Sequence, residues 1–182
     1  MTVETLDPRE LASISDELKK MFNTDQEART NNVPEVTIKI DQENTQRLKE
    51  IIDRIGWPTK SKVGENSAHY AWLLVQHADQ DLEFQKKCLE LMKQEQKEEL
   101  EQEDIAYLED RILVAENKQQ LYGTQWYVDE TTGEYNPEEI VEPDKLDERR
   151  AEMGMEPFAV YEKDMRKMYE EWQKNKNTPT AK

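Results

Sequence analysis

His77 is one of only two histidines in the sequence, and it stands directly before Ala78-Asp79 and one helical turn before Asp81. A histidine partly shielded from water beside a carboxylate is a common design for a general base, because the carboxylate fixes the tautomer and stabilises the imidazolium. We therefore expect His77 to act as a catalytic base with Asp81 as its orienting partner. The alternative is that His77 bonds a helix end while Asp79 and Asp81 cap helices.

Arg111 is the second candidate, since it follows Tyr107 by one helical turn. A guanidinium in an aromatic setting can hold a carboxylate or phosphate with two parallel hydrogen bonds. In that role Tyr107, Arg111 and Asp79 would line a substrate-binding surface. The alternative is an internal ion pair between Arg111 and Asp79, Asp81 or another acid.

The segment Tyr122-Gly123-Thr124-Gln125 contains a glycine suited to a tight turn. Such a turn can deliver a neutral side chain to a fixed place. We expect it to bring Gln125, with Tyr122, to the same site as a hydrogen-bonding partner of the substrate.

Other kinds of chemistry find less support. His77 and Asp81 have a spacing that can ligate a metal, but two further ligands are missing and no zinc motif is present, so no metal site is predicted. Cys88 lies on an apolar helix face without a second cysteine, which indicates a core position rather than a nucleophile. The sequence contains no phosphate-binding glycine loop, nucleophile elbow or dinucleotide fingerprint. It therefore does not identify a cofactor.

The elements that must position these residues are mainly helical. Apolar residues cover most of the circumference between Glu65 and Ala78, which predicts a central helix buried on several sides. Helices are also predicted over residues 7–22, over Asn44–Ile55 with Gly56 as the stop, and from Pro157 to Trp172. A small β-hairpin is predicted over about residues 125–136, turning at Gly133.

Three segments carry weaker patterns. Residues 23–33 are polar and predict a loop, and Val36–Ile40 alternates as a strand or an extended lead-in would. The acidic stretch 95–104 has little to bury and predicts an exposed helix end or a connection. The fold class is therefore mainly α, a single-domain bundle of five to seven helices with one small hairpin, covering residues 7–172. Residues 1–6 are expected to be frayed and 173–182 disordered.

Composition limits the partners. Of the 182 residues 36% are charged and 35% hydrophobic, and the net charge is −16. Such a chain repels phosphodiester backbones and anionic lipid, so neither nucleic acid nor membrane is an expected partner, whereas a basic protein is possible. A single cysteine, the lack of a long apolar run and the N-terminal residues favour a cytoplasmic location.

Several motifs occur together in order: Gly56-Trp57-Pro58, Gln76-His77-Ala78-Asp79 with Asp81, Ala106-Tyr107-Leu108 with Asp110-Arg111, and Tyr122–Gln125. With Asp25-Gln26, Arg29 and Asp147–Arg150, they resemble a mainly bacterial family catalogued as a domain of unknown function. The likeness spans roughly residues 10 to 165. It implies a cytosolic helical domain in which these polar residues form a set, and it carries no reaction over.

Two hypotheses follow. In the first, the protein is an enzyme or binder that acts on a small anionic molecule in a pocket where His77, Arg111 and Gln125 converge, with hydrolysis or group transfer as the reaction class. In the second, it is a non-catalytic acidic interaction module whose polar residues form a structural network.

Overall fold

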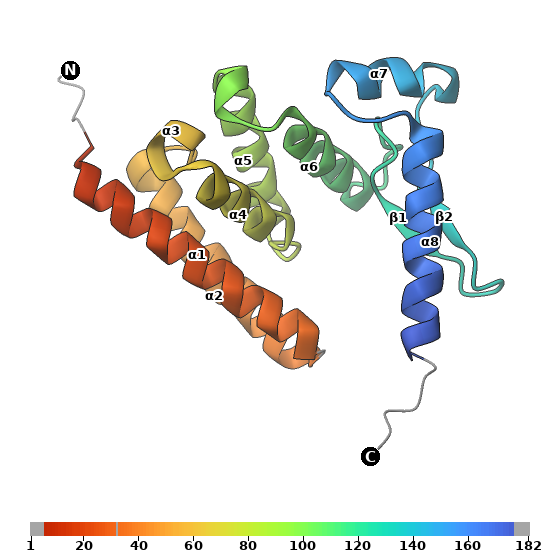
Figure 1. Ribbon diagram of the computed structural model, residues 1–182, viewed down its shortest axis with the longest axis horizontal. Helices are drawn as coiled ribbons and strands as arrows, with labels where there is room; N and C mark the ends of the chain where they lie inside the picture. The colour runs from red at the N-terminus through yellow and green to blue at the C-terminus, as the bar shows by residue number, and fades with distance from the viewer. Residues whose placement is uncertain (1–5, 32, 177–182) are drawn as a thin grey trace. The chain divides into compact units, whose positions relative to one another are not determined.

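Figure 1 shows a computed structural model of the chain, which describes residues 6–31 and 33–176. Within these residues the fold is mainly α with one two-stranded hairpin, as predicted, but it has eight α-helices rather than five to seven. The described helices are α1 (Pro8–Asn31), α2 (Pro34–Ile55), α3 (Lys60–Val63), α4 (Glu65–Gln76), α5 (Leu82–Gln94), α6 (Gln102–Ala115), α7 (Leu146–Glu152) and α8 (Phe158–Lys176), with 3-10 turns at Lys97–Glu99 and Pro143–Lys145. None of the described helices is long and apolar enough to cross a membrane.

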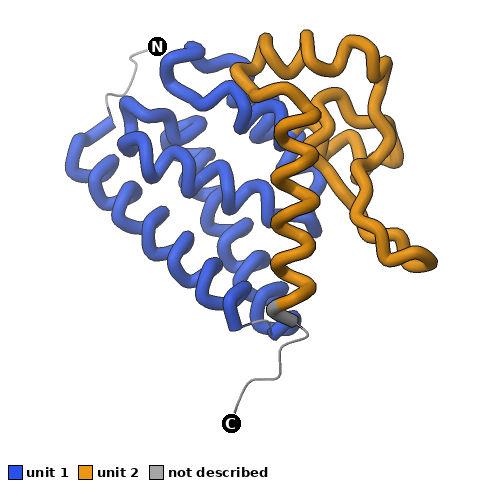
Figure 2. The backbone as a smooth tube through the Cα atoms, turned by 45° about the vertical axis from the view of Figure 1, so that its right-hand side comes forward, with its two compact units in different colours: residues 1–108 blue, residues 109–182 orange. Residues whose placement is uncertain are grey.

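The chain divides into two compact units, residues 1–108 and 109–182, and the division falls inside α6 (Figure 2). Each unit is described by itself below.

In unit 1, α1 packs against α2, α3 and α4, and α4 also contacts α2 and α5. Ala68, Ala71, Leu74 and Val75 of α4 are all buried, because the helix has neighbours on several sides. The predicted central helix is therefore confirmed. Cys88, on α5, has no exposed surface, and this burial raises the pKa of its thiol to about 12, as expected of a core cysteine.

Two predictions in this unit are wrong. Residues 23–31 continue α1 instead of forming a loop, and Val36–Ile40 belong to the first turns of α2 instead of a strand. Pro34 stands in the first turn of α2, and the N–H groups of Val36 and Thr37 donate to the carbonyl of Val33. Val36 and Ile38 are each 47% exposed, so their alternation with polar residues does not mark one face of a sheet.

Unit 2 contains the hairpin, in which β1 (Trp126–Val128) pairs antiparallel with β2 (Tyr135–Pro137). The turn includes Gly133 at φ +74°, as the sequence predicted. Aromatic rings join the hairpin to α8, since Tyr135 stacks on Tyr169 with ring centroids 4.6 Å apart.

The C-terminal helix is longer and less buried than predicted. It continues to Lys176 instead of ending at Trp172, so the disorder expected from residue 173 does not begin there. Met168 and Trp172, which the sequence placed on the apolar stripe, are more than half exposed. The expectations for residues 1–5 and 177–182 lie outside the described residues.

Candidate functional site

A cavity of about 230 Å³ lies in unit 1 between one face of α2 and the connection from α4 to α5. Residues four apart on a helix share a face, which places Asp41, Thr45 and Lys49 of α2 along one wall. The connection supplies His77 and Asp81 on the other wall. Two residues that the sequence analysis named therefore line one hollow, which we call the His77 cavity.

His77 is the C-cap residue of α4, and its Nδ1 atom lies 2.9 Å from Oδ1 of Asp25 on α1. The Nε atom of Arg29 lies 3.1 Å from the same nitrogen. If Nδ1 were an acceptor for Arg29, its lone pair would also face the Asp25 oxygen and repel it. The tautomer with a proton on Nδ1 avoids this, because the ring then donates to Asp25 while Arg29 bonds the carboxylate. The other ring nitrogen, Nε2, is left with the lone pair of a base.

Arg29 links the two acids of this cluster. Its terminal nitrogen lies 3.0 Å from Asp25 and 2.6 Å from Asp41. Burial raises the pKa of Asp25, but hydrogen bonds from His77 and Arg29 outweigh it, so the net pKa is lowered and the group stays ionised. Burial also raises the pKa of Asp41, and there the opposing effect of Arg29 does not cancel it. The cluster therefore contains two different acids: Asp25, which stays ionised, and Asp41, which holds its proton more readily.

Asp81 has a different set of contacts. Its side chain accepts a hydrogen bond from the backbone N–H of Phe84 at 3.0 Å and so caps α5, which confirms the capping expectation. Its other oxygen lies 2.5 Å from the Lys49 ammonium, and the hydrogen bond from Lys49 lowers the pKa of the Asp81 carboxyl. The carboxylate at Nδ1 of His77 is therefore Asp25, from α1, in the position that the sequence analysis gave to Asp81.

Asp79 lies two residues after His77 and is exposed. It accepts a hydrogen bond of 3.3 Å from Gln85, whose amide also donates to the carbonyl oxygens of Val75 and Gln76 at the end of α4. These contacts place Asp79 at the helix end.

Asp25, Asp41 and His77 each offer a ligand atom within 4.8 Å of the others, so this trio could hold a divalent metal ion. The sequence predicted no metal site, and the guanidinium of Arg29 already bridges the two carboxylates. A metal ion would have to displace that guanidinium before it could bind both acids.

The remaining predicted site residues lie elsewhere. Tyr107, at the end of unit 1, meets Trp72 edge to face at 6.1 Å between ring centroids. In unit 2, Arg111 lies 3.5 Å from the side-chain oxygen of Gln125. The structure thus brings Arg111 and Gln125 together in unit 2 and places His77 in unit 1, so a pocket shared by all three stays a prediction.

The turn that carries Tyr122 and Gln125 is held by buried polar groups of unit 2. Asp110 is fully buried and accepts hydrogen bonds from the backbone N–H groups of Leu121, Tyr122 and Thr124 and from the Thr124 hydroxyl. Gln120, also fully buried, receives the N–H of Gln125 at 2.8 Å. Burial raises the pKa of the Tyr122 hydroxyl to about 12. These contacts give Asp110 and Gln120 a structural role.

Sequence reasoning missed Asp25, Arg29, Asp41 and Lys49 as members of the site. Asp25 and Arg29 occur in a motif that supported the family resemblance and are four residues apart, the spacing of neighbours on a helix. The spacing alone does not identify them, because the polar composition of residues 23–33 predicts a loop instead of a helix.

No curated protein and no solved structure matches the chain. A family of unknown function (DUF6624) matches residues 12–173, and the chain therefore belongs to that family.

Proposed function

We propose that the protein is an enzyme that transforms a small molecule in the His77 cavity, with His77 as the general base. The observation that supports this most directly is the 2.9 Å contact between Nδ1 of His77 and the buried, ionised Asp25. That contact fixes the tautomer and stabilises the imidazolium that forms when Nε2 accepts a proton. Asp25 is then a positioning residue, because it acts through His77.

The reaction class that fits these groups is hydrolysis or group transfer. His77 takes the proton of an attacking water or hydroxyl group as its oxygen forms the new bond. The leaving group departs with the bonding electron pair and takes up the proton that His77 removed from the nucleophile, so that the imidazolium returns to the neutral base. Each proton that leaves the nucleophile is then matched by one delivered to the product.

The charges of the cavity bear on the substrate. Its wall carries two carboxylates, Asp41 and Asp81, and one ammonium, Lys49, which Asp81 already engages. This arrangement favours a small neutral molecule over an anion. The anionic substrate class predicted from Arg111 depends on a residue of unit 2 and stays a prediction.

A second candidate function is supported by the way the cluster satisfies itself. Asp25, Arg29, Asp41 and His77 bond one another, and Asp110 and Gln120 do the same with the turn in unit 2. In this alternative the polar residues are structural and the acidic surface, with its net charge of −16, engages a basic partner. We propose a cytoplasmic location for the protein under either function.

A ligand screen separates the two candidates. Thermal shifts of the wild-type protein with a library of small metabolites are compared with those of His77→Asn. The asparagine amide can still donate toward Asp25 but carries no base. Asp53→Asn, at an exposed carboxylate paired with Lys87, serves as the control. Metabolites that shift the melting temperature are then incubated with each protein and their conversion is measured. We expect at least one to be converted by the wild type and the control, with turnover lowered about 10²- to 10⁴-fold in His77→Asn. Equal turnover in all three proteins, or a library in which nothing binds while His77→Asn alone loses stability, contradicts the enzyme proposal.

A further inference from the structure

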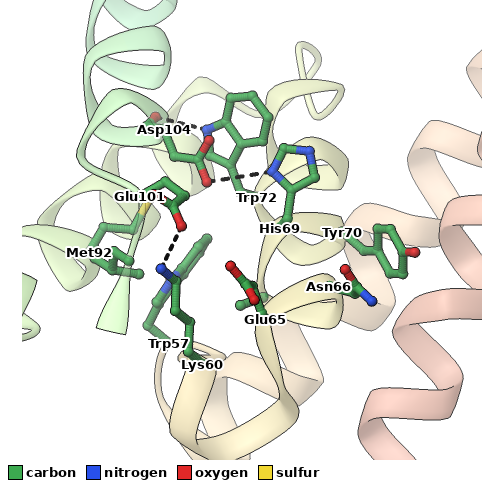
Figure 3. A pocket seen from close by; sticks show the side chains of 12 residues that line it. Trp57, Lys60, Glu65, Asn66, His69, Tyr70, Trp72, Met92, Glu101 and Asp104 are labelled. Atoms are coloured by element: carbon green, nitrogen blue, oxygen red, sulfur yellow. Dashed lines mark hydrogen bonds and ion pairs between the residues drawn. The ribbon is translucent and has the colours of Figure 1, made fainter. Parts of the chain in front are cut away.

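We propose that a second cavity of unit 1 binds a small organic ammonium ion that also carries an oxygen acceptor. This cavity, which we call the tryptophan cavity, has a volume of about 210 Å³ and is lined by Trp57, Trp72, Lys60, Glu65, Glu101 and Asp104, among others (Figure 3). None of its lining residues lines the His77 cavity. The inference is therefore independent of the proposed function.

Aromatic rings form much of the wall. Trp57 comes from the connection after α2, and His69 and Trp72 come from α4, whereas the ring of Tyr70 stacks on Phe22 and points away from the other side chains in Figure 3. The rings of His69 and Trp72 lie 4.9 Å apart, and Figure 3 shows them above the hollow. Faces of tryptophan and tyrosine attract cations through the ring quadrupole, most strongly where water is excluded. Such a wall suits a cation with an apolar body.

The charged groups of the cavity have an excess of acid. Figure 3 shows the carboxyl groups of Glu65, Glu101 and Asp104 directed toward the same space as the ammonium of Lys60. Lys60 lies 2.5 Å from Glu101 and neutralises that one carboxylate. A cation in the hollow would meet the carboxylate of Glu65 and, once it is ionised, that of Asp104, whereas both would repel an anion.

A metal ion fits this cavity less well than an organic cation. Among the described residues, the acids of the tryptophan cavity do not form a trio with ligand atoms within 4.8 Å of one another, as the His77 cluster does. Divalent ions need oxygen ligands at about 2.0–2.6 Å from one centre. Carboxylates spread around aromatic rings match a larger ion. The volume is below the ~300–1,000 Å³ of pockets for drug-sized ligands, so the ion is small.

Asp104 gives the cavity a buried acid. Its side chain is 10% exposed, and burial, followed by the nearby charges of Glu103 and Glu101, raises its pKa to about 8 against the opposing effect of Lys60. The ring of His69 lies 3.7 Å from its carboxyl oxygen. The carboxyl is therefore largely protonated near neutral pH, and a bound cation would favour its ionised form. Ligand binding should then release a proton.

The indole N–H of Trp57 is the reason why we propose an oxygen acceptor on the ligand. It lines the cavity, it is 1% exposed, and its Nε1–H has no hydrogen-bond partner within the described part of the chain. A buried donor without a partner costs about 1–3 kcal/mol, so such groups are rare in folded proteins. A hydroxyl or carbonyl oxygen on the ligand would satisfy it once the surrounding side chains move apart enough to expose the N–H.

Calorimetric titration of the full chain with choline tests the proposal, because choline combines a permanent positive charge with a hydroxyl oxygen. The first control is the neutral isostere in which carbon replaces the ammonium nitrogen, and the second is tetramethylammonium, which keeps the charge and lacks the oxygen. We expect choline to bind about tenfold tighter than the isostere and measurably tighter than tetramethylammonium. Equal affinity for choline and the isostere overturns the cation site, and so does the absence of binding at millimolar choline at pH 9. Equal affinity for choline and tetramethylammonium overturns the oxygen acceptor.

Variants locate the site. Glu65→Gln should weaken choline binding about three- to tenfold, whereas Glu83→Gln, at an exposed glutamate of α5, should leave it unchanged. Wild-type affinity should rise between pH 7 and pH 9 as Asp104 ionises, and Asp104→Asn should remove this rise. Equal weakening by Glu65→Gln and Glu83→Gln would show that choline is held by the general negative charge and not by this cavity. Neither result depends on His77, so failure here leaves the enzyme proposal standing.

Discussion

Nδ1 of His77 and Oδ1 of Asp25 lie 2.9 Å apart, although the two residues are 52 positions apart in the sequence. The contact exists because α1 packs on α4, which brings the C-terminal third of the first helix to the C-terminal end of the central one. Both partners are shielded from water, since Asp25 is 1% and the His77 side chain 18% exposed. The ionised form of a carboxylate that is buried in this way depends on its hydrogen-bonding partners for stabilisation.

Asp25→Asn tests that dependence. The amide cannot accept from both His77 and Arg29 as a carboxylate does, so we expect the free energy of unfolding at pH 7 to fall by about 2 kcal/mol. Because the folded-state pKa of Asp25 is lowered, its contribution is present above the unfolded pKa and is lost as pH falls through the folded value. The gap between wild type and variant should therefore shrink below about pH 4.

Urea denaturation at pH 7 and pH 3.5 measures this gap, with the exposed Asp53→Asn as the control. A gap that is absent at pH 7, or that widens in acid, contradicts the role given to the Asp25 carboxylate.

Asp104→Asn should have the opposite pH dependence. The pKa of Asp104 is raised from 3.8 to about 8, so the folded protein binds a proton that the unfolded chain releases between those values. The wild type then loses stability as pH rises through this window, and the asparagine variant does not. We expect Asp104→Asn to gain more than about 1 kcal/mol relative to wild type between pH 5 and pH 8.5. A constant difference across this range, measured by urea denaturation, would show that the carboxyl is already ionised at pH 5.

The third prediction concerns the carboxylate of Asp110. It accepts hydrogen bonds from three backbone N–H groups and the hydroxyl of Thr124, all in the 121–124 turn. Asp110→Asn places an amide donor among these donors and should destabilise unit 2 by about 2–4 kcal/mol. Thr124→Val removes only the hydroxyl and should cost about 1 kcal/mol.

A double-mutant cycle checks this assignment. Because the two groups share a hydrogen bond, the effects of Asp110→Asn and Thr124→Val should not add in the double variant. Additive losses would mean that the Thr124 hydroxyl does not contribute through Asp110.

The sequence predicted those features that depend on local pattern. Apolar residues around the whole of Glu65–Ala78 predicted the buried α4, Gly133 marked the turn of the hairpin, and Asp81 had the type and position of a helix cap. Each of these follows from a few neighbouring residues and their preferred backbone geometry.

The partners of His77 could not be predicted in this way. Which residue reaches Nδ1 depends on how α1 packs on α4, and a polar stretch such as 23–31 looks like a loop when its neighbours in space are unknown. Asp25 and Ala28 of this stretch are buried, because α1 continues across the surface of the other helices. Tertiary packing therefore decided both the helix and the site.

Gly123 and Gly133 form a matched pair for the last prediction, since both have φ +74°. A Cβ at Gly133 would meet nothing within 4 Å, so Gly133→Ala should cost only the backbone strain of about 1–2 kcal/mol. A Cβ at Gly123 would lie 2.6 Å from Cε2 of Phe158, which is closer than real contacts allow. Gly123→Ala should therefore cost at least about 1 kcal/mol more than Gly133→Ala, because the start of α8 must shift or the ring must leave its place.

Thermal unfolding of both variants in a Phe158→Leu background separates strain from collision. The smaller side chain should relieve part of the loss at Gly123 and leave the loss at Gly133 unchanged. Equal losses in the two alanine variants, with or without the Phe158 ring, would show that backbone conformation alone requires glycine in the Tyr122–Gln125 motif. A larger, ring-dependent loss at Gly123 would instead identify the close approach of Phe158 as a second reason for glycine there.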